Sequence, residues 1–281
     1  MLLSLVTCTK NRAPLLPAFL ASIADLGIDG IDLEFILVDN GSSDGTWPLF
    51  QDWAKGRVGF RSIREERPGV SVARNTGWRA ATGRIILMID DDCYPNSDLI
   101  PAWQKVFEEY PTVGWGSGRV LLYNPQDDPV AIDEGEQVRF HRAGTYLPCG
   151  EVQGSNHAYR REVLERIGGF DPRTGVGTRF GCEDIETAAR ASYSGWDGIY
   201  DPRPMVRHNH GRRNGEGFHR LHTVYADGEG AYYAKCILNP AMRKDYIRPF
   251  LGRLYHRTWK YRLRILRAAF AWCLLELFHK G

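Results

Sequence analysis

The 281-residue chain is 43% hydrophobic and 25% charged, a composition that excludes global disorder, collagen and coiled coil. A chain of this length holds one large domain, or one domain with an appendage. The formal net charge of +2 is too small to indicate binding to nucleic acid, and we expect no such partner. Six widely spaced cysteines without a CxxC pair favour reduced thiols in a cytoplasmic protein.

Short β-rich runs alternate with helix-like segments over the first hundred residues. This alternation predicts a largely parallel sheet covered by helices. Ligands of such sheets bind beyond the carboxyl ends of the strands, so the polar stretches TCTKNR, DNGSSDGT and DDDCYP should gather at one edge. The predicted strands are 2–6, 33–38, 58–63 and 85–89, and the predicted helices are 15–26, 46–54 and 70–81.

The pattern changes in the second half of the chain. Residues 123–152 form a polar, acidic insert that we expect to be mostly loop, and GSNHAYRREVLERIGGFDP predicts a strand end followed by a helix and a glycine-rich turn. After Gly211 the pattern is helical. We therefore predict an α/β domain over 1–212 and a helical extension over 213–281.

Three consecutive aspartates follow the apolar run ILMI. If this segment is extended, the side chains of Asp90 and Asp92 converge on one point while Asp91 faces elsewhere. Carboxylate oxygens at a strand end suit Mg²⁺ or Mn²⁺ that also binds a phosphate. Without a cation, two unit charges about 4 Å apart repel by roughly 4 kcal/mol at an effective dielectric constant near 20. The alternative interpretation is a hydrated acidic loop.

Five blocks occur in an order and at a spacing that resemble a known family. They are LVTCTKNR, LEFILVDNGSSDGT, RPGVSVARNTGWRAATGRIILMIDDDCYP, GFDP and GCEDIETAARASYSGW. Together they resemble the inverting family 2 glycosyltransferases with the GT-A fold, and the resemblance covers roughly residues 1–212. It implies a mixed, mainly parallel sheet flanked by helices. It also implies sugar transfer from a nucleotide-sugar donor to a saccharide or lipid-linked acceptor.

The resemblance implies donor-binding roles for residues of the first half. Asp39 matches the carboxylate that holds the nucleoside, and Thr7 and Thr9 match nucleotide-contact positions. Arg74 matches a basic residue beside the nucleotide pocket. The residues alone leave other interpretations open, because Asp39 also suits a turn and helix N-cap, and Arg74 suits a salt bridge on a helix surface.

The same resemblance assigns the metal site and the general base. Asp92 is expected to bind Mn²⁺ or Mg²⁺, Asp90 to contact the donor ribose or the metal shell, and Asp91 belongs to the same donor-binding group. Asp184 is expected to take the proton from the acceptor hydroxyl, while Glu183 positions the acceptor or tunes Asp184. Acids in a first helical turn can also simply complement the helix dipole.

Two histidines, His208 and His210, lie at i and i+2 in PMVRHNHGRR. Related enzymes with this architecture often carry a histidine near this position that completes the metal shell, and we favour His208 over His210. Imidazole combined with carboxylates favours Mn²⁺ over Ca²⁺. Zinc-dependent hydrolysis is less consistent with the sequence, which has neither HExxH nor a cysteine-rich set.

The C-terminal region is basic and aromatic. Nine lysines and arginines lie between Arg243 and Arg267 against one acid, Asp245, and the apolar block AAFAWCLLELF follows. No run of about 20 uninterrupted apolar residues predicts a membrane-spanning helix. A cationic amphipathic helix can instead lie in an anionic membrane interface, which predicts peripheral contact with the inner face of the cell membrane. The alternatives are packing on the catalytic domain or a homodimer contact.

Two other functions share parts of this pattern. A nucleotidyltransferase that makes sugar nucleotides has the same architecture, but it typically carries a glycine-rich basic loop after its first strand, and TCTKNRAPLL is not one. A non-catalytic nucleotide-sugar-binding module is the rival from another class. The carboxylates at 39, 92 and 184 count against it.

Overall fold

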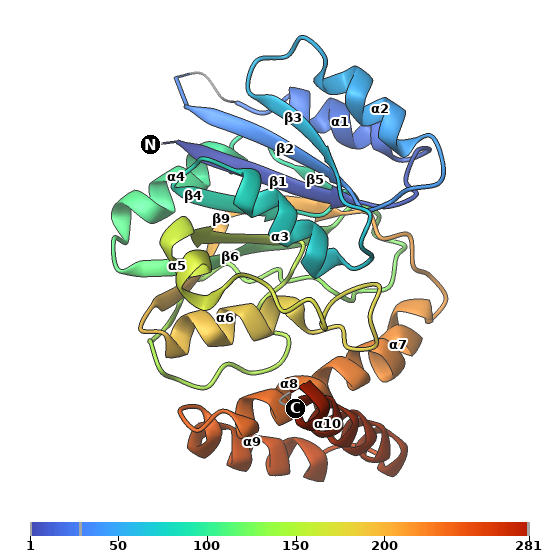
Figure 1. The fold of residues 1–281 in the computed structure, drawn as a ribbon, viewed down its shortest axis with the longest axis vertical. Coiled ribbons are helices and arrows are strands. Elements are labelled where there is room, and N and C mark those ends of the chain that lie inside the picture. Colours follow the sequence, from blue (N-terminus) through green and yellow to red (C-terminus); the bar gives the residue numbers. More distant parts are fainter. Residues whose placement is uncertain (1, 28–29, 280–281) are drawn as a thin grey trace.

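The computed structural model describes residues 2–27 and 30–279 of the chain, which form a mixed nine-stranded sheet covered by helices on both faces (Figure 1). The strands are β1 Leu3–Thr9, β2 Leu33–Asp39, β3 Phe60–Arg64, β4 Ile85–Ile89, β5 Cys93–Pro95, β6 Val113–Leu122, β7 Arg139–His141, β8 Asn156–Arg160 and β9 Asp197–His208. The sheet order is β3-β2-β1-β4-β8-β6-β9-β5, with β7 paired to β9.

The helices form two layers on the sheet and a third group below it (Figure 1). Side chains of α1, α2 and α4 pack on one face of the sheet, and those of α3, α5 and α6 pack on the other. The helices are α1 Leu16–Ala24, α2 Thr46–Ala54, α3 Val70–Ala80, α4 Leu99–Glu109, α5 Arg161–Ile167, α6 Glu183–Tyr193, α7 Glu216–Arg220, a π-helical turn Leu221–Tyr225, α8 Ala226–Leu238, α9 Arg243–Tyr255 and α10 Trp259–His279.

The predicted fold class is confirmed, and so is the parallel arrangement of the first four long strands. β1 pairs in parallel with β2 and β4, and β2 pairs in parallel with β3. All five residues of β4 are buried, as expected of a continuous apolar strand covered on both faces. The strand predicted at 2–6 is longer than expected and continues to Thr9.

The strand ends bring the polar stretches to one edge of the sheet. Thr9 at the end of β1 lies opposite Asp39 at the end of β2, and Ile89 at the end of β4 lies opposite Asn156. The chain then turns into the short strand β5, whose Cys93 pairs with His208. The predicted gathering at one sheet edge is confirmed, and His208 joins it through β9.

The C-terminal helices share a hydrophobic core with α6. Trp272 of α10 and Tyr232 of α8 are fully buried in the cluster that also holds Ile185 of α6. Glu186 of α6 is 1% exposed, and the Nζ atom of Lys235 in α8 lies 2.6 Å from its Oε1. The boundary predicted between residues 212 and 213 stays a prediction. None of the described helices is long and apolar enough to cross a membrane.

Candidate active site

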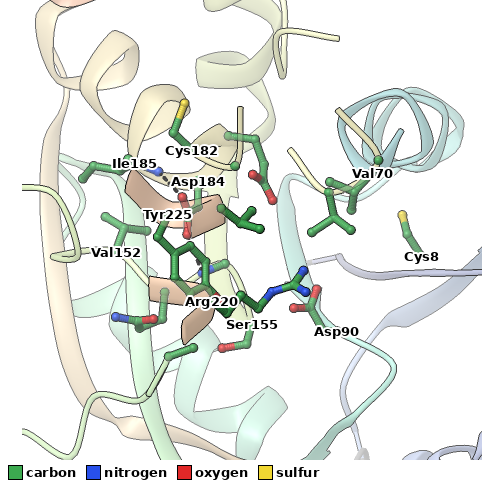
Figure 2. A pocket seen from close by; sticks show the side chains of 18 of the residues that line it. Cys8, Val70, Asp90, Val152, Ser155, Cys182, Asp184, Ile185, Arg220 and Tyr225 are labelled. Atoms are coloured by element: carbon green, nitrogen blue, oxygen red, sulfur yellow. Dashed lines mark hydrogen bonds between the residues drawn. The ribbon is translucent and has the colours of Figure 1, made fainter. Parts of the chain in front are cut away.

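A cavity of about 760 Å³ opens at this edge of the sheet and extends to the C-terminal helices. Asp90, Asp91 and Asp92 line one side, and Glu183 and Asp184 at the start of α6 line the other. Figure 2 shows Asp90 and Asp184 facing the same space from opposite sides. Two groups of carboxylates that are far apart in the sequence therefore share one cavity.

The aspartate segment is a turn, so the expectation of an extended conformation is wrong. The N–H of Cys93 donates to the carbonyl oxygen of Asp90 at 3.1 Å, and this hydrogen bond folds the chain back into β5. All three carboxylates line the cavity, including Asp91, which the extended geometry would have turned away. The repulsion between the carboxylates is balanced by basic side chains of the protein itself.

Arg12 supplies one of these positive charges. Its Nη2 donates to Oδ2 of Asp92 at 2.9 Å, and its Nε lies 3.4 Å from Oδ1 of Asp91. Thr9 donates a hydroxyl hydrogen bond to Asp91. Burial raises the pKa of Asp91 to about 7, although Arg12 opposes the shift.

Arg74 connects the two acidic groups of the cavity. Its side chain, on α3, donates to Asp90 at 2.9 Å, to Glu183 at 3.0 Å and to the carbonyl oxygen of Gly154 at 3.1 Å. The residue is only 4% exposed, so the salt bridge is buried in the cavity wall and not on a helix surface. Burial raises the pKa of Asp90 in spite of Arg74.

His208 and Asp92 form a pair that is suited to a cation. Nδ1 of His208 donates to the carbonyl oxygen of Ala131 at 3.2 Å, so Nε2 faces Oδ1 of Asp92 at 3.3 Å. An unprotonated Nε2 and a carboxylate oxygen repel each other at this distance unless a proton or a metal ion lies between them. Burial lowers the pKa of His208, but Asp92 outweighs that effect and the net pKa is raised.

A candidate metal site is built around this pair. Ligand atoms of Asp92, Cys93 and His208 lie within 4.8 Å of one another. Cys93 contributes a thiol to this cluster, Asp92 a carboxylate and His208 an imidazole. Oxygen and imidazole nitrogen are a donor set that Mn²⁺ accepts.

His210 is close to His208 but is held differently. The two rings lie 5.1 Å apart, on the same side of the chain as predicted. Nε2 of His210 donates to the carbonyl oxygen of Asp128 at 3.1 Å, and Nδ1 accepts the N–H of Arg212 at 3.0 Å. With both ring nitrogens in use, His210 lies outside the metal-ligand cluster found among the described residues.

Asp39 and Thr7 do not line the cavity, whereas their neighbours Asn40 and Thr9 do. Asp39 is fully buried, accepts the N–H of Ser42 at 3.2 Å, and has one carboxylate oxygen without a hydrogen-bond partner among the described residues. The Thr7 hydroxyl is likewise buried and unpartnered there. The structure thus places both residues one layer behind the cavity wall.

Asp184 has the protonation behaviour of a base that works near neutral pH. Its Oδ2 accepts the N–H of Gly154 at 3.0 Å and its Oδ1 accepts the N–H of Ile185 at 2.7 Å. Burial raises its pKa to about 7, and the neighbouring Glu183 raises it as well. The contact with Ile185 stabilises the helix start, so Asp184 complements the helix and faces the cavity at the same time.

Several residues that line the cavity were not predicted from the sequence. Arg12 follows the first strand directly, which is the signal that could have identified it. The others lie in the C-terminal extension, where their charges indicated only a basic surface. These additional lining residues are Arg12, Arg220, Tyr225, Glu229, Arg253 and Arg257.

Comparison with known proteins identifies the family. The sequence model described as "Glycosyl transferase family 2" matches residues 4–168, which is more than half of the chain. The chain belongs to glycosyltransferase family 2. Among its relatives, the putative glycosyltransferase EpsH of Bacillus subtilis (strain 168) is 31% identical over 172 residues. That match spans 58% of this chain and 48% of the relative.

Two further proteins extend the comparison. The glucosyl-dolichyl phosphate glucuronosyltransferase of Haloferax volcanii is 28% identical over 156 residues, which are 51% of this chain and 47% of the relative. The chain therefore spans less than half the length of both relatives. The mannosyltransferase PcManGT from Pyrobaculum calidifontis, solved with GDP-Man and Mn²⁺, has the same fold with a TM-score of 0.66 at 24% identity. That likeness covers 95% of this chain and 73% of the other.

Proposed function

We propose that this family member is a metal-dependent, inverting glycosyltransferase that moves a sugar from a nucleotide-sugar donor to a saccharide or lipid-linked acceptor. One observation carries the proposal: the three aspartates, His208 and the half-buried Asp184 line one cavity, which Asp90 and Asp184 face from different sides (Figure 2). An inverting transfer needs this separation, because the acceptor oxygen attacks the reacting carbon opposite the leaving nucleoside diphosphate and gives its proton to the base. PcManGT, named with GDP-Man and Mn²⁺, and the glucuronosyltransferase named for a dolichyl phosphate substrate support the donor and acceptor classes.

The donor end would hold the metal and the diphosphate. Asp92 and His208 would bind Mn²⁺ or Mg²⁺, and Arg12 and Arg74 keep the neighbouring carboxylates in place. When bound, the ion neutralises the negative charge that develops on the leaving nucleoside diphosphate. Asp90 and Asp91 would complete the donor-binding wall.

The nucleoside would lie beside Thr9 and Asn40. Asp39 has a free carboxylate oxygen, which supports a role in holding the nucleoside, but Nε of Arg64 lies 3.7 Å from its other oxygen. Because Asp39 is fully buried and does not line the cavity, a direct contact with the donor would require the residues that cover it to move. Thr7 would support Asp39 from the adjacent strand.

Asp184 would act as the base toward the acceptor. Its pKa near 7 leaves a large ionised fraction at neutral pH and matches the Brønsted optimum for proton abstraction. Oε1 of Glu183 lies 3.0 Å from Nη1 of Arg74, which fixes its position. Its negative charge would help to keep the pKa of Asp184 raised.

A ligand screen tests the donor assignment. We expect one nucleotide sugar of a panel to raise the melting temperature of the protein in the presence of Mn²⁺, because binding to the folded state alone stabilises it. At a ligand concentration of about 100 Kd this stabilisation is about 2.7 kcal/mol. Differential scanning fluorimetry with and without Mn²⁺ measures it. A panel in which every nucleotide sugar leaves the melting temperature unchanged contradicts the proposal.

We further propose that α10 places the protein on an anionic membrane surface at the inner face of the cell membrane. One side of α10 is buried in the protein, and another carries exposed apolar residues at helical spacing. Lys260 and Arg267 flank this exposed face, which gives it positive charge. The exposed stripe consists of Trp259, Leu263, Leu266, Phe270, Leu274 and Leu277.

Replacing Leu266 and Phe270 by serine is expected to reduce membrane binding. Each large apolar side chain that leaves a membrane interface forfeits about 1.5–3 kcal/mol, so the partition coefficient of the double variant should fall by tenfold or more. Sedimentation with vesicles that contain phosphatidylglycerol measures this. Val58→Ser is the matched control, because Val58 is 98% exposed on the opposite part of the molecule. Unchanged sedimentation together with loss of a homodimer would assign the stripe to a subunit contact instead.

A further inference from the structure

The cavity has a second cationic end beyond Asp184, formed by the C-terminal helices. Arg253 and Arg257 line it there. Arg253 pairs with Glu229, a 2% exposed residue that also accepts the hydroxyl of Tyr261 at 2.9 Å. The guanidinium of Arg257 lies 4.7 Å from the centre of the Tyr261 ring and has no carboxylate partner in the described ranges 2–27 and 30–279. Two guanidinium groups against one carboxylate give this end a net positive charge.

This cationic end belongs to the same space as the base. Cys149 also lines the cavity. Burial raises the pKa of its thiol, the charges of Glu229 and Asp184 raise it further, and those of Arg253 and Arg257 lower it. Asp184, Arg253 and Arg257 line the cavity together with Cys149, so the base and the two arginines border a common volume.

The wall between Asp184 and the arginines is largely apolar. Val152 and Ile185 are each 3% exposed, and the π-helical turn contributes Val224 and Tyr225. In Figure 2 the side chains of Val152, Ile185 and Tyr225 project into the same part of the cavity as Asp184. π-Helical turns occur frequently at functional sites, because the extra residue redirects side chains. A wall of this kind can pack against the apolar face of one sugar ring.

The donor does not account for the second cationic end. Positive charge for the donor diphosphate is already present beside the aspartates: Nη2 of Arg12 lies 2.9 Å from Oδ2 of Asp92, and Arg212 also lines the cavity. Figure 2 shows Arg220 extending across the cavity toward Asp90. One nitrogen each of Arg212 and Arg220 is buried without a hydrogen-bond partner among the described residues. The donor end and the acceptor end therefore each have cations of their own.

We propose that the acceptor is a saccharide linked through a phosphate to a hydrocarbon chain, with Arg257 and Arg253 binding the phosphate. The sugar lies between the phosphate and Asp184, with its apolar ring face on Val152, Val224 and Tyr225 and its hydroxyl toward Asp184. The hydrocarbon leaves the phosphate on the side away from Asp184. The inference rests on the proposed function, because it takes Asp184 as the base. It commits the acceptor to the lipid-linked class. Arg257 lies in the link between α9 and α10, so the exposed apolar face of α10 is the adjoining surface for the rest of the lipid.

Binding of short phosphate and sugar amphiphiles tests this assignment. The full chain is first saturated with Mn²⁺ and pyrophosphate to fill the donor end, and calorimetric titrations then compare octyl phosphate, octyl glucoside and inorganic phosphate below micellar concentration. We expect octyl phosphate to bind at least about tenfold more tightly than either other probe. Arg257→Gln should weaken octyl phosphate about tenfold, because a hydrogen bond to a charged group is lost, and should leave octyl glucoside unchanged. Arg257→Lys should retain part of the preference.

Arg248→Gln is the matched control, since Arg248 is an exposed arginine of α9 outside the cavity and should keep the wild-type affinities. Equal losses for octyl phosphate and octyl glucoside in Arg257→Gln, or no loss, would overturn the phosphate assignment. Inorganic phosphate that binds as tightly as octyl phosphate would overturn the hydrocarbon assignment. Failure of Mn²⁺ and pyrophosphate to bind would count against the donor site, and the same amphiphile titrations without them would still decide the acceptor class.

Discussion

Replacing Asp92 by asparagine is expected to lower the rate of sugar transfer by about 10³-fold, because the metal ion loses its anionic ligand. Asparagine preserves the size of the side chain, so Arg12 and His208 keep their places while the proposed metal site loses its negative charge. Initial rates measured as a function of Mn²⁺ concentration are the direct test. The half-saturating Mn²⁺ concentration should rise together with the loss of rate.

The control for this variant is Asp98→Asn. Asp98 is exposed before α4, makes no side-chain cap hydrogen bond and does not line the cavity, so its replacement should leave both the rate and the Mn²⁺ dependence unchanged. An Asp92→Asn protein with a wild-type Mn²⁺ titration would place the metal elsewhere.

Asp184→Asn is expected to lower kcat by about 10²- to 10⁴-fold while the affinity for the nucleotide is retained, because only the proton transfer is lost. The pH dependence provides a second test. A base whose pKa is raised to about 7 is protonated below that pH, so the wild-type kcat should fall about tenfold per pH unit below pH 7 and level off above it. The variant should lack this acidic limb. The profile is measured at saturating Mn²⁺, so that protonation of His208 does not release the ion.

The thermal stability of the Asp184→Asn variant provides a control, because we expect the variant to lose activity but to gain stability at alkaline pH. The folded protein holds the Asp184 proton more tightly than the unfolded chain does, so a stabilisation present at acidic pH is lost as the pH rises through about 7. Asparagine removes this cost, and the variant should melt at a higher temperature than the wild type at pH 8. Glu162→Gln, an exposed first-turn acid of α5, should change neither rate nor melting temperature. A slow Asp184→Asn protein that is also less stable at pH 8 would indicate a structural role.

The part of the fold with clear local signals could be predicted from the sequence. β4 was predicted with its observed limits because five consecutive apolar residues end abruptly at charge. The helix predicted over 46–54 also matches α2. β6 was not predicted because Gly114, Gly116 and Gly118 break its apolar pattern. In the structure these glycines admit the close approach of other side chains: an added Cβ atom would meet atoms of Trp196, Trp103 and Asn156 at less than 3.0 Å.

β9 is difficult to predict from the sequence for a different reason. Its prolines at 202 and 204 argue against a central strand, because proline cannot donate to the ladder. The structure accommodates them in an irregularity, where the register with β6 jumps from the pair Gly118 and Asp201 to the pair Arg119 and Met205. No local sequence signal indicates such a bulge without knowledge of the neighbouring strand.

The candidate site likewise contains residues with a local sequence signal and residues without one. Its carboxylates and histidines stand out because each occurs at a strand end or a helix start. Their partners do not, since the contact of Arg12 with Asp92 spans 80 positions in the chain and that of Arg74 with Glu183 spans 109. Arg253 and Arg257 belong to a basic stretch that resembles a surface, and only the packing of α8 to α10 on α6 turns them into the cavity.

The shared core between α6 and the C-terminal helices limits how such an enzyme can acquire new substrates in evolution. The buried carboxylate of Glu186 pairs with Arg190 and with Lys235. Replacing the chain after residue 212 by a foreign segment would remove Lys235 and leave Glu186 with Arg190 alone, in the same helical turn as Asp184. Loss of a buried partner of this kind typically costs about 3–5 kcal/mol. New specificities therefore arise more readily by single replacements along the inner faces of the tail than by exchange of whole segments.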